Sequence, residues 1–341
     1  MMFNSQRKIP ASRRTDSGFT LIELMIAMVL GLLIVAGVGS VFIANQNAYR
    51  TNVALGEVQE SARTSFEFLA RDIRSAGANP CGTASVASVL KPGGDSMLYS
   101  SGGIEGWENA TTAPNLPASG VGAPVAGAGD ALRLAGARGA GLELESTNGQ
   151  RLSVNLKSAT TAIGKGDIVM ICDIEKATLF QVTSDNASNK TVTHNKDDGS
   201  PGNQTECLNH PVPQSPGSTC TTFSPSSYLA IPTNYVWYIG ENDAGGRSLY
   251  RYGRGQEATS GTAEMVRGVW AMEVTYHEQG GNSYVAAGSV GNWETVDAVR
   301  LELTVRSGGV QPASAMGAGT DNQPLERAFT STVALRNRLD N

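Results

Sequence analysis

Hydrophobic residues are most concentrated near the N-terminus, where an apolar run covers residues 19–44. The run contains one charged side chain, Glu23. A helix rises about 1.5 Å per residue, so a run of this length can cross a hydrocarbon layer of roughly 30 Å. The pattern therefore predicts a membrane-spanning helix over residues 19–44.

The helical period continues beyond Ala44, but the pattern becomes amphipathic. Apolar residues recur at spacings of three and four, and most charged residues fall on other faces. The apolar residues of this stripe are Leu55, Val58, Ala62, Phe66, Leu69 and Ile73. Gly77 and Pro80 predict the end of the helix. We expect one helix from Thr20 to Ala76, whose second half packs on the domain that follows. An independent coiled coil is less favoured, because the stripe lasts only about three heptads.

The rest of the chain has the pattern of short strands separated by polar turns. Alternation is clearest where Leu301, Leu303 and Val305 are interspersed with polar residues. The expected strands are 96–99, 131–135, 142–145, 152–156, 167–172, 178–183, 235–239, 248–252, 271–277, 298–306 and 328–335. Apart from strand 96–99, segment 81–129 is expected to be mostly loop. Segment 186–227 is polar and Pro-rich, with almost no core of its own, and 308–322 is a glycine-rich linker. These patterns predict an α+β fold, with a long N-terminal helix packed on an antiparallel β-sheet domain with long loops.

Charges on the N-terminal side of the apolar run indicate its orientation. Arg7, Lys8, Arg13 and Arg14 precede it, with only Asp16 of opposite sign. Such a basic flank favours a cytoplasmic N-terminus and translocation of everything after the run. The run is too long for the core of a secretory signal peptide, and no small-residue cleavage site ends it. Any cleavage is therefore expected before the run.

Glu23 is costly in an apolar layer, so it is expected to be functional and to have a partner. The alternative is that its carboxylate merely reaches the lipid headgroups.

The charge of the chain argues against nucleic-acid binding. The formal charge is −5, and the first eighteen residues contribute +3, which leaves −8 for the remainder. An acidic surface gives no broad attraction for nucleic acid, so we expect no direct binding. The composition, with 40 glycines and 17% charged residues, suits a loop-rich exported domain.

All four cysteines follow the predicted membrane segment and should therefore lie in an oxidising compartment. They are Cys81, Cys172, Cys207 and Cys220. A bridge between Cys207 and Cys220 would close a loop of about a dozen residues and contribute roughly 3 kcal/mol. Cys81 would then pair with Cys172. The other two connectivities stay open.

The sequence gives little sign of catalysis or of a cofactor or metal. It has no phosphate-binding P-loop and no HExxH motif, and Gly253-Arg254-Gly255 lacks the strand–helix context of a dinucleotide loop. We expect a turn there, and no enzymatic activity.

Two polar groups resemble metal ligands only weakly. His194, Cys207 and His210 could be ligands, but a disulfide with exposed histidines is favoured. The possible calcium ligands miss the spacing of an EF-hand, so a solvated turn is expected. These residues are Asn195, Asp197, Asp198 and Asn203. The four tryptophans are expected to pack in the core or on a sheet rather than to bind a sugar or a surface. They are Trp107, Trp237, Trp270 and Trp293.

The sequence Gly18-Phe19-Thr20-Leu21-Ile22-Glu23 resembles the processing site of type IV prepilins. The resemblance implies that a separate prepilin peptidase cuts between Gly18 and Phe19 and methylates the new Phe19 amine. Glu23 becomes the fifth residue of the mature chain. A charged amine in an apolar bundle is the partner that Glu23 needs, within one subunit or in the next.

Parts of the exported domain look like the PilW-type minor pilins. These parts are Gly166-Asp167-Ile168-Val169-Met170, Phe180-Gln181-Val182, Leu249-Tyr250-Arg251, residues 299–307 and residues 329–338. The resemblance implies a type IV pilin-like fold. It would have a cleaved leader (1–18), a membrane and fibre-core half-helix (19–44), an amphipathic half-helix (45–76) and an exported β-rich domain (77–341). Ser40 departs from the major pilins, which often have a helix-kinking proline there, although Gly37 and Gly39 could loosen the helix.

The resemblance also implies a function and partners. A minor pilin is a structural and priming component of the type IV pilus, supporting assembly, twitching motility and adhesion or DNA uptake. It is held in the inner membrane and then enters the fibre or its tip. The implied partners are other minor pilins, the major pilin, the prepilin peptidase, the inner-membrane assembly platform and, as a candidate, a tip adhesin.

Three alternatives stay open. A type II secretion pseudopilin would share the whole N-terminus, and neighbouring genes would distinguish it. A tip adhesin would bind a surface ligand through its exported domain. A plain single-pass membrane protein would not be cleaved.

Overall fold

The computed structural model describes most of the chain. The described residues are 18–77, 81, 86–91, 103–146, 153–184, 190–196, 202–208, 220–224, 226–253, 261–308 and 324–338. Residues 1–17 of the leader, the expected strand 96–99, and the residues Asp197, Asp198 and His210 lie outside them.

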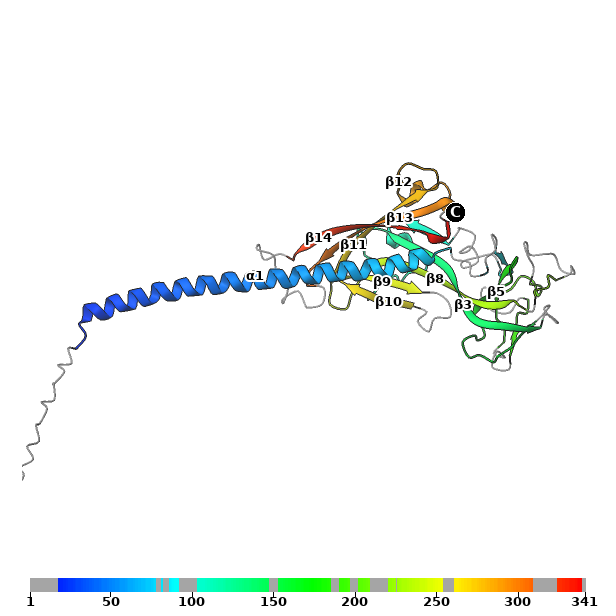
Figure 1. The fold of residues 1–341 in the computed structure, drawn as a ribbon, viewed down its shortest axis with the longest axis horizontal. Coiled ribbons are helices and arrows are strands. Elements are labelled where there is room, and N and C mark those ends of the chain that lie inside the picture. Colours follow the sequence, from blue (N-terminus) through cyan, green and yellow to red (C-terminus); the bar gives the residue numbers. More distant parts are fainter. Residues whose placement is uncertain are drawn as a thin grey trace, which may run out of the picture. The chain divides into compact units, whose positions relative to one another are not determined.

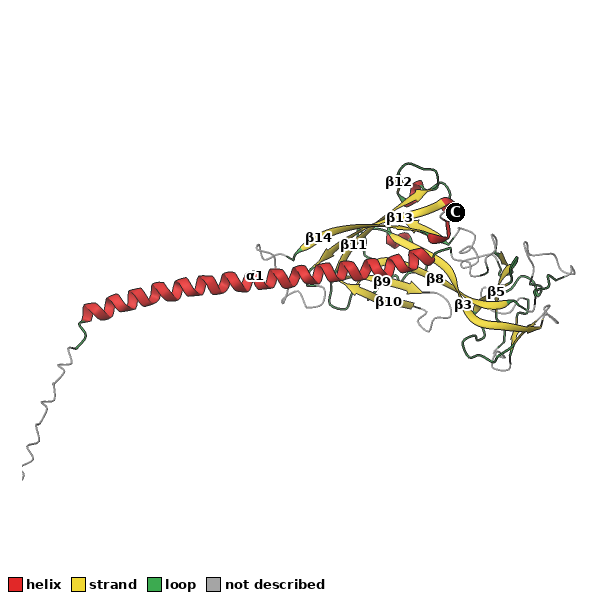
Figure 2. Ribbon diagram, viewed as in Figure 1, coloured by secondary structure: helices red, strands yellow, loops and turns green. Residues whose placement is uncertain are grey.

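Among the described residues there is one α-helix, α1 (Leu21–Ser75), which accounts for both parts of the N-terminal pattern (Figures 1 and 2). Its ends agree within one residue with the expected helix. By internal contacts the chain divides into two compact units, residues 1–52 and 53–341, and α1 contributes to both. The helix ends at Gly77, whose positive φ of 66° is the left-handed conformation common just after a helix. The Gly77 N–H donates to the carbonyl oxygen of Ala135 at 2.8 Å, which fixes the helix end to a strand.

In the second unit, α1 packs through its apolar stripe. Val58, Ala62, Leu69 and Ile73 are buried, and Leu55 and Phe66 are half-buried. The buried members share one hydrophobic core with strands of both sheets. The second half of the helix therefore belongs to the β-domain and is not an independent coiled coil.

The strands form two sheets. The larger has ten strands: β1 (Ala87–Ser88), β2 (Ile104–Trp107), β3 (Ala131–Ser146), β4 (Ser153–Leu156), β5 (Ile168–Cys172), β6 (Ala177–Gln181), β7 (Thr191–Thr193), β8 (Tyr228–Glu241), β9 (Arg247–Gly253) and β10 (Gly261–Arg267). The smaller has the order β12-β11-β13-β14: β11 (Val269–Glu278), β12 (Tyr284–Val285), β13 (Val296–Arg306) and β14 (Glu326–Ala334). All pairs are antiparallel except β1–β6. Short 3₁₀ helices are η2 (Ala110–Thr112), η4 (Ala287–Ser289), η5 (Trp293–Thr295) and η7 (Arg336–Arg338).

Two long strands, β3 and β8, pair with each other in the second unit (Figure 1). They connect two hydrophobic cores. The beginning of β8 pairs with β5, and its end pairs with β9. One core joins α1, the end of β8, β9 and the four-stranded sheet. The other is built from β4, β5, β6 and β7 with the beginning of β8. We call these the helix core and the distal core.

The α+β expectation is confirmed, with differences in detail. The expected strands 131–135 and 142–145 are one strand, β3, which continues through three glycines with a bulge between Gly139 and Leu142. The segment 186–227, expected to have almost no core of its own, contains β7 and contributes Val192, Leu208 and Phe223 to the distal core. The short strands β2 and β12 and the polar strand β10 were not predicted.

Two disulfides are present, as the cysteine content predicted. Cys81, just beyond the end of α1, is bonded to Cys172 in β5, with 4.8 Å between their Cα atoms. Cys207 is bonded to Cys220, with 5.0 Å between their Cα atoms. Both lie beside the distal core, which buries Leu208 and Phe223 next to the second bridge. The Cys207–Cys220 bridge cross-links a polar segment that has little apolar surface to bury, whereas Cys81–Cys172 ties the chain just after α1 to a buried strand.

Candidate membrane and assembly site

The first turn of α1 is closed by a reciprocal cap between Thr20 and Glu23. The Glu23 N–H donates to Thr20 Oγ1 at 3.3 Å, and the Thr20 N–H donates to Glu23 Oε2 at 3.1 Å. The Thr20 hydroxyl also donates to Glu23 Oε2, at 3.0 Å. This is the capping box of a Ser/Thr-x-x-Glu sequence, which satisfies N–H groups that a helix start leaves without partners. Glu23 Oε2 accepts both hydrogen bonds that the carboxylate receives from Thr20.

The expected processing residues lie at this cap. Phe19 is 90% exposed, and no atom lies within 4 Å of the place where a Cβ on Gly18 would stand. The peptide bond between Gly18 and Phe19 is therefore open to a large partner. Glu23 is four residues from Phe19 along the chain, and its described hydrogen bonds go to Thr20.

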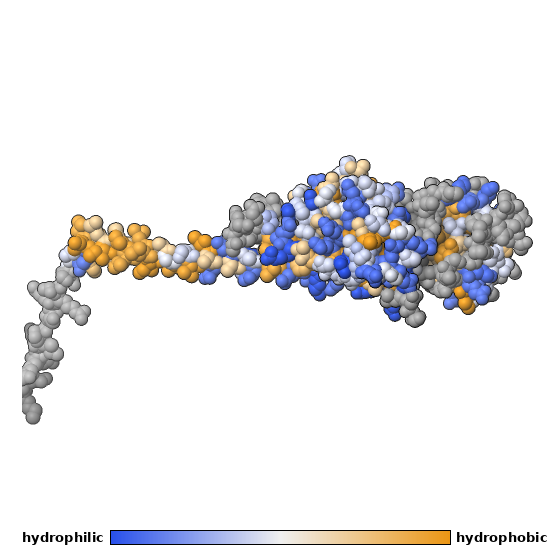
Figure 3. All heavy atoms as spheres, turned by 90° about the horizontal axis from the view of Figure 1, so that it is seen from above, coloured by the Kyte–Doolittle hydropathy of each residue, from blue (hydrophilic) through white to orange (hydrophobic). Residues whose placement is uncertain are grey.

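The apolar half of α1 exposes hydrophobic side chains in every direction within its own unit. Leu21, Leu32 and Val35 are each about 70% exposed or more. Figure 3 shows this stretch as a band of hydrophobic atoms. Within the described residues, α1 is the one helix that is long and apolar enough to cross a membrane. A helix that is apolar all round needs lipid or other helices around it.

Asp72 fixes the other end of α1 to the larger sheet. Trp237 in β8 donates from Nε1 to Asp72 Oδ2 at 3.2 Å, and Arg251 Nη1 in β9 lies 3.7 Å from the same oxygen. Asp72 is 7% exposed. Burial raises the pKa of its carboxyl group, while Arg251, Arg71 and the Trp237 N–H act in the opposite direction. This contact orients the helix about its axis and along it.

Sequence reasoning missed both Thr20 and Asp72. The signal for Thr20 was available, because Thr-x-x-Glu before an apolar run marks a helix start. Asp72 lies next to Ile73 on the buried face, and a carboxylate at that position needs a buried donor. The donors come from β8 and β9, which are far away in the sequence.

Of the weak metal candidates, Cys207 is in a disulfide, and His210, Asp197 and Asp198 lie outside the described residues. No group of three or more His, Cys, Asp or Glu side chains suited to a metal occurs in the described part of the chain. The expectation that His194 is exposed was wrong: it is fully buried and lies edge-on to Phe180. Burial lowers the pKa of His194 to about 4, so it packs as a neutral ring.

Asn203 also differs from the expected solvated turn, because it is fully buried. Its side chain accepts from the Gln181 N–H and donates to the Gln181 carbonyl oxygen, both at 2.8 Å. Its side chain thus pairs with the backbone at the end of β6 as a neighbouring strand would.

The tryptophans pack as expected. Trp237 is fully buried, and Trp293 lies edge-on to Tyr276. Arginine guanidinium groups lie over the other two rings: Arg133 over Trp107, and Arg247 and Arg306 over Trp270.

Two family models match the chain. Residues 13–39 match the prokaryotic N-terminal methylation motif, and residues 236–337 match the type IV pilus-assembly protein W family, PilW. Both matches agree with the resemblance of the sequence to PilW-type type IV minor pilins. No curated protein and no solved structure matches the chain.

The two matches coincide with distinct parts of the fold. The methylation motif covers the cap and most of the exposed apolar half of α1. The PilW match runs from β8 to η7 and therefore covers most strands of the helix core, although β2 and β3, which also contribute to this core, lie outside it. The distal core and both disulfides lie outside the matched residues. The PilW family is structural rather than enzymatic, and the motif and the apolar helix suit a pilin anchored in the inner membrane.

Proposed function

We propose that this chain is a minor pilin that is held in the inner membrane as a precursor and then incorporated into a type IV pilus. The observation that carries the proposal is the exposed apolar half of α1, which begins at an accessible Gly18–Phe19 bond and contains one charge, Glu23. A fibre core made of such helices would bury them in place of lipid.

Processing follows from the same residues. The basic leader stays in the cytoplasm. A separate prepilin peptidase cuts between Gly18 and Phe19 and methylates the Phe19 amine, so this chain is a substrate and not an enzyme.

The geometry of the cap supports a second role for Glu23. Its Oε2 is bound by Thr20, which leaves Oε1 to accept a hydrogen bond from an amine. In a fibre, the charged Phe19 amine of a neighbouring subunit is the natural donor, since a buried charge requires an opposite one. The pair sets the axial register between subunits.

The partners that follow are other minor pilins, the major pilin and the inner-membrane assembly platform. The exported domain is placed on the outer surface of the fibre or at its tip. There it supports assembly and, through the assembled fibre, twitching motility and adhesion or DNA uptake.

Replacement of Glu23 tests this role. Glu23→Ala should leave cleavage largely intact and lower the amount of the chain in sheared fibres by at least about tenfold, because an unpaired amine in an apolar bundle costs several kcal/mol. Immunoblots of membrane and fibre fractions measure both. Glu60→Ala removes an exposed carboxylate of the same helix and is the control. Normal abundance of Glu23→Ala in fibres would contradict the register role.

A further inference from the structure

Strand β14 forms an open edge of the four-stranded sheet. It pairs with β13 through nine consecutive residue pairs, from Ala298 with Ala334 to Arg306 with Glu326, without a bulge. Among the described residues, no strand pairs with its other edge. A long regular edge of this kind is a template for a further strand.

The register shows which backbone groups face that edge. The Leu335 N–H donates to the Asp297 carbonyl oxygen, and the Ser307 N–H donates to the Leu325 carbonyl oxygen. Hydrogen-bonded pairs alternate along an antiparallel ladder, so odd-numbered residues of β14 bond to β13. Ala328, Thr330 and Thr332 therefore direct their N–H and C=O groups away from β13. Natural edges are protected by charges, prolines or bulges, and this central part has none.

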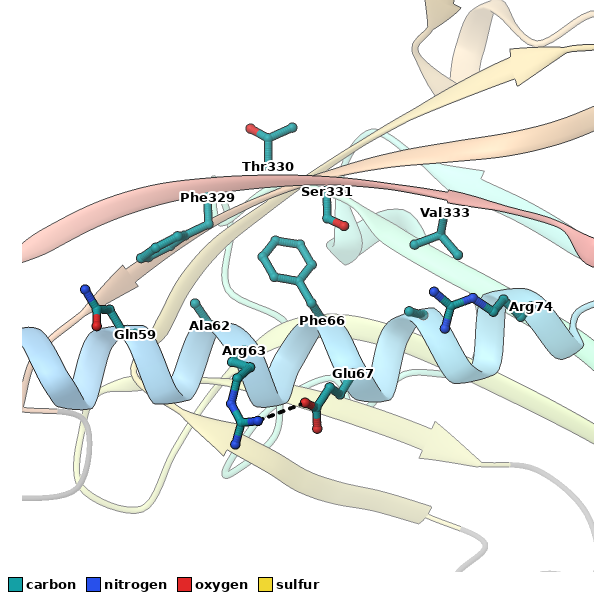
Figure 4. A pocket seen from close by; sticks show the side chains of 11 residues that line it. Gln59, Ala62, Arg63, Phe66, Glu67, Arg74, Phe329, Thr330, Ser331 and Val333 are labelled. Atoms are coloured by element: carbon teal, nitrogen blue, oxygen red, sulfur yellow. Dashed lines mark hydrogen bonds and ion pairs between the residues drawn. The ribbon is translucent and has the colours of Figure 1, made fainter.

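A groove lies beside the same edge, between β14 and α1 (Figure 4). Its volume is about 530 Å³. Phe329, Ser331 and Val333 point from β14 towards the helix, and Phe66 points from α1 towards them. Ala62 and Ala70 complete an apolar floor. Side chains on one face of an added strand would enter this groove at alternate positions.

The charged rim of the groove is incompletely paired. Arg63 is bound by Glu60 and Glu67. Arg74 also lines the groove and has no carboxylate partner among the described residues. The rim therefore offers one uncompensated positive charge on the side of the C-terminal end of α1, where a carboxylate would complement it.

We propose that the edge of β14 and this groove bind an extended strand of another polypeptide, with apolar side chains at alternate positions and a carboxylate near one end. Hydrogen bonds to Ala328, Thr330 and Thr332 supply the affinity. Apolar side chains on the floor and a carboxylate at Arg74 select the sequence. The site is separate from the apolar half of α1 and would join the exported domain to a partner.

The test uses the full chain in detergent micelles and one synthetic peptide, acetyl-Thr-Val-Thr-Val-Thr-Val-Asp. Hydrogen exchange of individual amides is measured with and without the peptide at about 1 mM, the weak limit of specific binding. We expect slower exchange at Ala328, Thr330 and Thr332. A peptide with proline in place of its central threonines, which cannot pair, should have no effect.

Two variants identify the contacts. Thr330→Pro removes one outward N–H, at an edge position where proline is tolerated, and should weaken binding about tenfold. Thr330→Ala keeps the N–H and should bind normally. Arg74→Glu changes an exposed side chain and should weaken binding about threefold or more. Thermal unfolding of each free variant verifies its fold.

Three results would overturn the inference. The first is no slowing of exchange at these three amides by the peptide. The second is equal binding by the folded Thr330→Pro and Thr330→Ala variants. The third is full protection of these amides in the free chain, which would mean that the chain covers its own edge. None of these outcomes depends on cleavage or on entry into a pilus.

Discussion

At the scale of single residues, Asp130 joins the two sheets through hydrogen bonds, and its burial disfavours the charged form of its carboxyl group. Its N–H donates to the Met272 carbonyl oxygen at 2.8 Å, and its Oδ2 accepts from the Val274 N–H at 2.7 Å. The side chain thus continues the pairing along the edge of β11. Burial raises the pKa of Asp130 to about 6, with further contributions from Glu273 and Glu108, against the Val274 hydrogen bond.

This raised pKa predicts a pH dependence with a definite sign. The folded chain binds the Asp130 proton more tightly than the unfolded chain, so this group favours folding at low pH. The contribution is lost as pH rises from about 4 to about 6.

Asp130→Asn should remove that loss. We expect stabilisation by about 1 kcal/mol at pH 8, after allowance for solvent around the half-buried carboxylate, and little change at pH 4. Denaturant unfolding at the two pH values measures this difference. An equal change in the free energy of unfolding at pH 8 and pH 4 would show that burial of the charged Asp130 carboxylate does not destabilise the folded chain.

At the scale of elements, the helix was the most predictable part of the chain. Its period extends over 55 residues, and its capping and ending residues are local. The strands were less predictable. Glycines of β3 indicated a turn, but pairing with β8 along ten residue pairs holds the strand through them. β7 lies in a polar segment, where one buried residue, Val192, is too weak a signal.

The contact between α1 and the sheet depends on Asp72. Asp72→Ala would leave the Trp237 N–H without its acceptor and Arg251 without its nearby carboxylate. We expect a loss of about 3 kcal/mol in the free energy of unfolding, measured by denaturant titration of the full chain in detergent.

Glu67→Ala is the matched control, because this carboxylate is on the same helix and its side chain is 63% exposed. It should change stability by less than about 0.5 kcal/mol. A similar small effect for Asp72→Ala would mean that the apolar stripe alone holds α1.

At the scale of the molecule, the sequence indicated one exported β-domain but not its division into a helix core and a distal core. That division results from two long strands whose halves have different neighbours, and such pairings are not local in the sequence. The buried His194 and Asn203 were misplaced for the same reason. Their polar character favoured the surface, whereas both are buried: His194 packs against Phe180, and Asn203 bonds to Gln181, both in β6.

The N-terminal candidate site, in contrast, could be identified from the sequence alone. Gly18, Phe19 and Glu23 are neighbours in the chain, so a short motif contains the whole set. The proposed cleavage and methylation are covalent changes at these residues, so a chemical measurement tests them.

Mass spectrometry of the N-terminus, on chain purified from membranes and from sheared surface fibres, tests the central proposal most directly. We predict that the fibre fraction contains a chain that begins at N-methylated Phe19. An intact N-terminus found only in membranes would contradict the pilin proposal and would indicate a single-pass membrane protein.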